Sequence, residues 1–232
     1  MRRTLTIAAG MVGLALLSAL AAAQQVAPTL DTVLAKMDDA AAHFQSAQAN
    51  FVFQQYQRVV DETDTQKGTV YYRKNGKQIE MMADFKEPDR KFVLYKDDKL
   101  EVYQPKIEQV MEYSAGANQQ ELESLMVLGF GGSGQDLKKS YDVTYQGEES
   151  IAGTQTAKLQ LIPKNDKLRS NLPQIILWID LASGISVQQK LMQTQGDYRL
   201  AKYSAIKVNA KINNDVFRLK TAGKTKFISP RG

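Results

Sequence analysis

The sequence of 232 residues contains no cysteine, one histidine and one tryptophan. Without cysteine, the chain forms no disulfide, no thiolate nucleophile and no iron–sulfur cluster. With a single imidazole, a structural zinc site or a histidine-rich catalytic metal site is strongly disfavoured. Hydrolase mechanisms that need a histidine base would depend on His43 alone. We therefore expect a protein that is not an enzyme, with no catalytic residue, no metal and no cofactor.

An excess of charge of one sign is also small, because 30 basic residues stand against 25 acidic ones and the formal net charge is +5. Part of this charge lies in an N-terminal segment with the pattern of a secretory signal. Two arginines precede the apolar residues 5–20, and an alanine triplet ending at Ala23 provides a cleavage site. An uncleaved membrane anchor is the alternative, although no basic stop-transfer cluster follows the apolar stretch.

Cleavage after Ala23 would divide the chain into a signal peptide, residues 1–23, and a single mature domain, residues 24–232. The mature domain would keep a net charge of +3, which is too small to indicate binding of nucleic acid. A cysteine-free exported protein is typical of the bacterial periplasm, where the core alone must stabilise the fold. We therefore expect a periplasmic protein without a nucleic acid partner.

Residues 29–46 follow the period of an amphipathic helix with one buried face. The apolar residues on that face are Leu30, Val33, Leu34, Met37, Ala41 and Phe44. Thr29 is the expected N-cap, because its hydroxyl is suited to accept a hydrogen bond from a backbone N–H of the first turn. His43 lies near the end of this helix. A partly exposed structural histidine is favoured there over a general base, because no partner residue is evident.

From residue 50 onward, apolar and polar residues alternate with the period of two that is typical of β-strands. Asn75-Gly76 and Asp97-Asp98 have the composition of tight hairpin turns, which favours antiparallel pairing of successive strands. The pattern predicts twelve strands, at 50–60, 69–74, 78–85, 91–96, 99–104, 107–113, 141–146, 156–162, 174–180, 185–193, 198–208 and 215–220. The predicted fold class is mainly β (α+β), with one long helix and one short one.

The short helix is expected at residues 119–128, followed by the glycine-rich stretch 129–134. The glycines match the pattern G-x-G-x-x-G, but a dinucleotide-binding fingerprint requires a preceding strand in a parallel βαβ unit. A helix precedes this stretch instead, so a loop or hinge is favoured over a phosphate-binding site. The last basic residues are expected to form a solvated tail rather than a binding patch; they are Lys220, Lys224, Lys226 and Arg231.

Several strands are apolar on both faces, which a single long helix cannot cover. Methionine and aromatic residues are frequent in the first six strands, and both suit a cavity that adapts to its ligand. Two interpretations remain open: these residues are simply the core, or a curved sheet holds an apolar ligand. In the second interpretation the residues expected to line the cavity for this apolar ligand are Phe51, Phe53, Tyr72, Met81, Phe92, Leu94, Met111 and Trp178.

The order of these parts resembles the LolA-like family of periplasmic outer-membrane lipoprotein carriers. The resemblance is carried by Leu30 to Phe44, Asn50 to Gln57, GTVYYRK at 68–74, DDKLEVYQP at 97–105, Leu125 to Gly129, Ile175 to Asp180 with Gly184, and Asp215-Val216-Phe217. It implies an incomplete, strongly curved antiparallel β-barrel of 11–12 strands with a helical lid. It also implies a monomeric carrier of acylated lipoproteins or other acyl lipids. The implied donor is an inner-membrane ABC transporter of the LolCDE type, and the implied acceptor is a LolB-like protein in the outer membrane.

The same resemblance implies a lid, whose apolar underside would be Leu125, Met126, Leu128 and Phe130, and whose hinge would be Gly129, Gly131, Gly132 and Gly134. LolA-like carriers typically have a lid-holding arginine in the strand after the first hairpin, where Lys77 and Gln78 stand here. The alternative is a sensor or scaffold of the RseB-like kind, which binds lipid or acylated partners and regulates envelope stress or biogenesis. Such regulators usually carry a second domain, and none is evident after Phe227, so the carrier is favoured.

Overall fold

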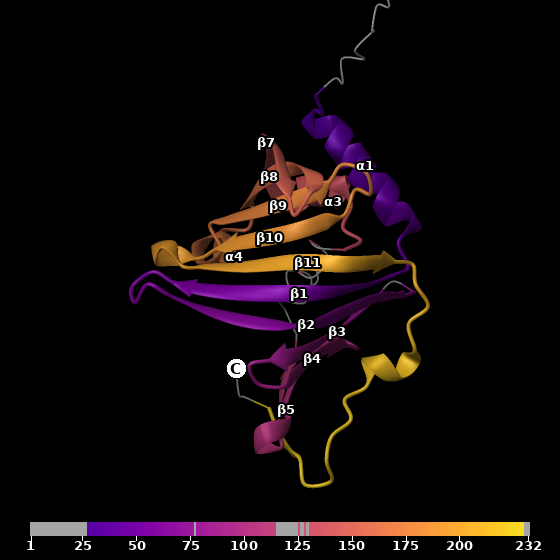
Figure 1. Ribbon diagram of the computed structural model, residues 1–232, viewed down its shortest axis with the longest axis vertical. Coiled ribbons are helices and arrows are strands. Elements are labelled where there is room, and N and C mark those ends of the chain that lie inside the picture. Colours follow the sequence, from indigo (N-terminus) through magenta and orange to yellow (C-terminus); the bar gives the residue numbers. More distant parts are fainter. Residues whose placement is uncertain (1–26, 77, 115–124, 126–127, 129, 230–232) are drawn as a thin grey trace, which may run out of the picture.

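The computed structural model describes residues 27–76, 78–114, 125, 128 and 130–229. Its main element is one curved, unclosed sheet in the order β12-β6-β5-β4-β3-β2-β1-β11-β10-β9-β8-β7 (Figure 1). The strands are β1 (Ser46–Gln57), β2 (Glu62–Asn75), β3 (Gln78–Glu87), β4 (Lys91–Lys96), β5 (Lys99–Gln104), β6 (Gln109–Ser114), β7 (Tyr141–Ile151), β8 (Thr154–Pro163), β9 (Gln174–Asp180), β10 (Ser186–Met192), β11 (Tyr198–Val208) and β12 (Lys226–Ile228). All paired strands are antiparallel except β12 and β6. The predicted open half-barrel is therefore confirmed.

Three α-helices occur in the described part of the chain: α1 (Leu30–His43), α3 (Gly134–Ser140) and α4 (Asp166–Asn171). Figure 1 shows α1 beside the half of the sheet that contains β7 to β10. Thr29 caps α1 as expected, through a capping box with Thr32. The helix ends before residue 46 because Phe44 has an extended backbone that leads into β1. The helix expected at 119–128 lies almost entirely outside the described residues.

The face of the sheet on which α1 packs is called the inner face. Under α1, it carries a cluster formed by Val33, Leu34, Met37, Leu159, Leu161, Ile175 and Leu177. A second cluster on β1 to β3 contains Ala47, Ala49, Phe51, Val70, Tyr72 and Ala83, together with Phe44, Phe130 and Ile185. Cross-strand register places Leu177, Gln189, Ala201 and Phe53 side by side, so both clusters lie on the same face.

The opposite face, called the outer face, is covered over β2 to β4 by the C-terminal segment, residues 209–229. Phe217, only 1% exposed, anchors this segment between Met82 and Leu94. The strand predicted at 215–220 is therefore wrong, since the chain forms the 3-10 helix η4 (Asn214–Phe217) that follows the apolar outer face. Lys226 does not lie in a free tail either, because it belongs to β12 at the edge of the sheet.

A buried ion pair on the outer face of the sheet contacts the C-terminal segment and helps to hold it in place. Glu80, 2% exposed, accepts hydrogen bonds from Arg73 Nε at 2.9 Å and from Asn75 Nδ2 at 3.2 Å. The Arg73 guanidinium also lies 4.3 Å from the centroid of the Phe217 ring and donates to Asn214. One arginine thus connects the sheet, a buried carboxylate and the anchoring aromatic ring.

Acidification is expected to destabilise the protein through Glu80. Burial raises the pKa of its carboxyl, but hydrogen bonds from Arg73 and Asn75 outweigh burial and hold the pKa below the ordinary value of 4.5. The stability that this lowered pKa contributes is present above that ordinary value and is lost as the pH falls through the folded-state pKa. Urea unfolding between about pH 3 and pH 7 measures the dependence. Glu80→Gln should flatten it at the acidic end and cost about 2 kcal/mol at neutral pH; an unchanged acid slope would contradict this role.

Candidate functional site

An apolar pocket of about 230 Å³ opens on the inner face between β1, β2, β3, β4 and β11. Its lining carries no charged side chain and consists of Phe51, Phe53, Val70, Tyr72, Met81, Ala83, Phe85, Val93, Ala201 and Tyr203. Four of the residues predicted for a lipid cavity are among them: Phe51, Phe53, Tyr72 and Met81. They meet because alternate residues of a strand share a face and the register pairs β1 with both β2 and β11.

Phe130 stands at one end of this pocket. Its ring centroid lies 5.0 Å from that of Tyr72 and 5.0 Å from that of Tyr203, and the side chain is 1% exposed. The hydroxyls of Tyr72 and Tyr203 form a hydrogen bond with each other, and burial raises the pKa of Tyr72 to about 12 and that of Tyr203 well above its ordinary value. Both phenols therefore stay neutral at physiological pH, and this end of the pocket bears no charge.

Two glycines allow the chain to carry Phe130 to this position. Gly131 has φ +86, and a Cβ there would lie 2.7 Å from Cδ1 of Phe44. Gly134 opens α3, where a Cβ would lie 2.6 Å from the carbonyl oxygen of Leu34 in α1. The glycine-rich stretch is therefore packed closely against α1 and against Phe44, the residue that follows α1, and close approach is what requires glycine at these two positions.

Gly134→Ala is expected to lower the free energy of unfolding by about 2 kcal/mol, because the added methyl group overpacks the contact between α1 and α3. Gly223→Ala is the matched control, since a Cβ at Gly223 meets no atom within 4 Å and its φ is not in the left-handed region. Chemical denaturation of the two variants and the parent protein measures the effect. Equal stability of all three proteins would show that the contact tolerates a side chain.

The described residues of the expected lid all pack on the inner face. Leu128 is 3% exposed and belongs to the cluster under α1, Leu125 packs against that cluster, and Phe130 belongs to the second one. Gly132 is half-buried. Met126 and Gly129 lie outside the described residues, and so does Lys77. Arg73, the arginine nearest to the position expected from the LolA-like pattern, points to the outer face and holds the C-terminal segment instead.

Four residues predicted for the cavity do not line it. Phe92 and Leu94 belong to the outer-face cluster that covers Phe217. Trp178 follows the inner-face residue Leu177 in β9, so its side chain is on the outer face. Its Nε1 donates a hydrogen bond to Glu149 at 2.9 Å. Met111 pairs with Val102 of β5, which pairs with the pocket residue Val93 of β4. Met111 is therefore on the inner face but two strands away from the pocket edge. All four residues have the apolar character expected of a cavity lining. Whether such a residue reaches the pocket depends on which face of the sheet its strand position gives it and on how far along the sheet it lies.

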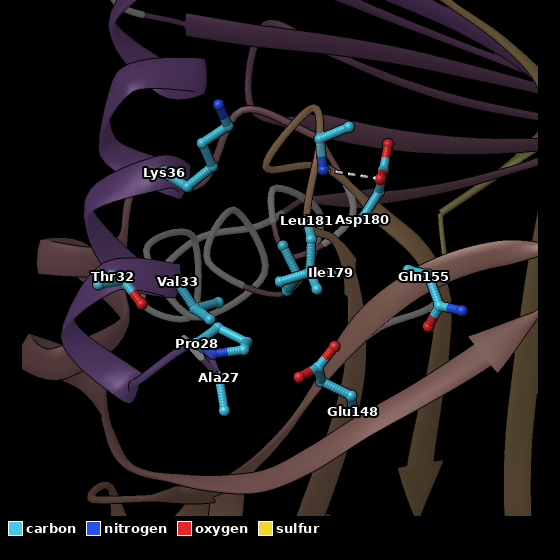
Figure 2. A pocket seen from close by; sticks show the side chains of 11 residues that line it. Ala27, Pro28, Thr32, Val33, Lys36, Glu148, Gln155, Ile179, Asp180 and Leu181 are labelled. Carbon is cyan, nitrogen blue, oxygen red and sulfur yellow. Dashed lines mark hydrogen bonds between the residues drawn. The ribbon is translucent and has the colours of Figure 1, made fainter. Parts of the chain in front are cut away.

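A second, larger hollow lies where α1 begins, beside the hairpin ends of β7, β8 and β9 (Figure 2). Its volume is about 780 Å³, but the side chains that line it include Lys36, Glu148, Gln155 and Asp180. Asp180 is already engaged, since its Oδ1 accepts a hydrogen bond from the backbone N–H of Ala182 at 2.9 Å. Charged side chains of both signs make this hollow a poor site for a hydrocarbon chain.

Sequence reasoning missed part of the pocket, namely Val70, Ala83, Phe85, Val93, Ala201 and Tyr203. For Phe85 the signal was present, because it shares strand parity with Met81 and the two side chains must lie on the same face. Tyr203 and Ala201 could not be assigned, because only the pairing of the distant strand β11 with β1 brings them to this place.

The described residues contain no group of histidine, cysteine or acidic side chains arranged to hold a metal ion. In the same part of the chain, no helix has the length and apolar character needed to cross a membrane.

A curved, unclosed half-barrel with an apolar pocket on its inner face is the LolA-like fold. The model of the MucB/RseB N-terminal domain family matches residues 29–221, and the chain belongs to this family. No curated protein matches the sequence significantly. The LolA-like half-barrel fold that the sequence implied is confirmed, and the family that the match shows is that of the MucB/RseB N-terminal domain.

Solved structures with the same fold share little sequence with the chain. The crystal structure of MucB has 14% identity and a TM-score of 0.52 over 82% of this chain and 62% of its own. An uncharacterized conserved protein from Thermus thermophilus has 12% identity and a TM-score of 0.54 over 86% and 98%. A LolA superfamily protein from Nitrosomonas europaea has 15% identity and a TM-score of 0.42 over 83% and 99%. The chain thus spans about three fifths of MucB.

Proposed function

We propose that this protein is exported to the periplasm, where it binds the acyl chains of lipoproteins or other lipids and carries them between the two membranes. The observation that carries the proposal is the uncharged pocket of about 230 Å³ on the inner face. Aromatic rings, methionine and small side chains line it, which suits a flexible hydrocarbon that must be released again. A carrier of this kind needs no reactive group, so we also propose that the protein is not an enzyme.

The size of the pocket is appropriate for part of an acyl chain. A cavity of about 150 Å³ accommodates a six-carbon benzene molecule, so the pocket corresponds to about nine methylene groups at the same density. At about 0.8 kcal/mol for each buried methylene, such a chain gains about 7 kcal/mol when it leaves water. A longer chain requires Phe130 to move, which would free on the order of another 150 Å³. Phe130 therefore acts as the lid residue in this proposal.

The proposed partners are acylated lipoproteins, an inner-membrane ABC transporter of the LolCDE type as donor, and a LolB-like acceptor in the outer membrane. We propose that the carrier works as a monomer with its signal peptide removed near Ala23. No cofactor takes part in this exchange, because a transfer between hydrophobic sites is driven by differences in affinity.

A periplasmic sensor is the second candidate, and the family match favours it. MucB, a member of the same family, has been solved in complex with the periplasmic part of MucA. In a sensor, the same pocket would bind a lipid in order to change the affinity for a protein partner. Acyl binding is common to both candidates, whereas net movement of lipid between membranes belongs to the carrier alone.

Mass spectrometry of an organic extract tests the proposal. The mature protein is purified from a periplasm without detergent, extracted, and the extract is weighed beside that of an unrelated periplasmic protein. Stoichiometric acyl lipid, or a co-purified lipoprotein, is the expected result. Transfer of labelled lipid from inner-membrane to outer-membrane vesicles then separates the carrier from the sensor. An extract without lipid, from a protein that also takes up none, would overturn the proposal.

A further inference from the structure

One lysine lies at the open end of the apolar pocket. Lys91 of β4 pairs with Phe85 of β3, so both side chains lie on the inner face. The Lys91 Nζ is 4.1 Å from the centroid of the Phe85 ring, which lines the pocket and meets Phe51 edge to face at 4.9 Å. The amine also donates a hydrogen bond to Oε1 of Gln66 at 3.1 Å. A half-buried ammonium group therefore stands directly beside the hydrocarbon site.

This ammonium group has no carboxylate partner within 4 Å among the described residues. The neighbouring acids are each paired with another cation: Asp84 with Arg90 at 3.2 Å, Glu87 with Lys67 at 2.9 Å and Asp89 with Lys106 at 3.2 Å. Burial lowers the pKa of Lys91, as expected for a cation that lacks a counter-ion. An anion at this point would regain favourable charge interactions that the protein itself leaves unmade.

A hollow is present on the far side of Lys91. Its volume is about 270 Å³, and it is lined by Gln66, Pro88, Asp89, Arg90, Lys91, Gln104, Lys106 and Ile107. Gln66 and Lys91 line this charged and polar hollow, and their cross-strand neighbours, Phe53 and Phe85, line the uncharged pocket. This division matches a molecule with a hydrocarbon tail and a polar head.

We infer that the ligand of the inner-face pocket is an anionic amphiphile whose carboxylate or phosphate is bound by Lys91 while its tail occupies the pocket. The inference rests on the proposed function and specifies the class of ligand. It favours fatty acids and phospholipids over the uncharged acyl groups of a lipoprotein. Gln66 orients the ammonium group, and the tail ends at Phe130, at the other end of the pocket.

The test compares matched ten-carbon ligands at neutral pH by isothermal titration calorimetry with the full mature protein. Decanoate and decyl phosphate carry the anion, and methyl decanoate has the same tail without it. The parent protein should bind the anions about 10-fold or more tightly than the ester, the range of one charge-assisted hydrogen bond. Tighter binding of decyl phosphate would indicate a phospholipid head, and tighter binding of decanoate a free fatty acid; both support the inference.

Lys91→Met should abolish the preference for the anions, measured as the ratio of the affinities for decanoate and methyl decanoate within the variant, because the apolar stem is kept and the charge is lost. Lys207→Met is the control, because it also removes one positive charge but at an exposed position of β11. It should keep the preference for the anions. Equal affinities of the parent protein for acid and ester, or a preserved preference in Lys91→Met, would overturn the inference while the proposed function stands. Failure of the parent protein to bind any of the three ligands would overturn both.

Discussion

Phe53→Glu is expected to lower the affinity for acyl ligands by more than about 100-fold, since a carboxylate buried beside a hydrocarbon chain costs several kcal/mol. Phe53 lines the pocket from β1, and its neighbours across the strands are Gln66 and Ala201. The side chain is only partly buried, so the sheet should still fold. Titration with methyl decanoate measures the loss, and circular dichroism checks the fold.

Val59→Glu is the matched control for this prediction. Val59 follows the same strand at the turn into β2 and is 84% exposed, so glutamate there adds the same charge away from the pocket. The control should bind like the parent protein. If Phe53→Glu also binds like the parent protein, the acyl chain does not occupy this pocket.

Phe217→Ala is expected to lower the free energy of unfolding by about 3–5 kcal/mol, the usual cost of deleting a fully buried phenylalanine. The ring fills the outer face between Met82 and Leu94 and lies under the Arg73 guanidinium. Its loss leaves a cavity and also removes the ring contact of a partly buried arginine. Chemical denaturation measures the change, and hydrogen exchange should show earlier opening of residues 209–229.

Val216→Ala is the control for the anchor, because Val216 is adjacent in sequence but only partly buried against the same cluster. It should cost much less than Phe217→Ala. A loss of less than about 0.5 kcal/mol in Phe217→Ala, within the range of surface substitutions, would mean that the C-terminal segment is not held by this ring.

Much of the architecture could be predicted because local patterns encode it. The stripe from Leu30 to Phe44 gives α1 a buried face, and Thr29 provides its N-cap. Asp97 and Asp98 both adopt positive φ, as a two-residue turn between antiparallel strands requires. Eleven of the twelve predicted strands correspond to strands of the sheet, since alternation and turn residues are properties of neighbouring positions.

The remaining features depend on contacts between distant segments. The residues around Phe217 alternate like a strand, yet they follow the outer face because Met82 and Leu94 offer an apolar surface there. Phe92 and Leu94 share the residue types of the pocket lining, but their strand parity places them on the other side. The proposed role of Lys91 could not be predicted from the sequence, because it depends on the lack of a nearby carboxylate, which only the three-dimensional structure shows.

Photo-crosslinking tests the central claim, that the inner-face pocket binds the acyl tail, most directly. A ten-carbon fatty acid with a diazirine at the end of its tail is bound to the mature protein, irradiated, and the labelled residues are identified by mass spectrometry. The account predicts label on Tyr72, Met81 and Phe130, and its loss in Phe53→Glu. Label concentrated in the hollow of Figure 2, around Val33 and Leu181, would contradict it.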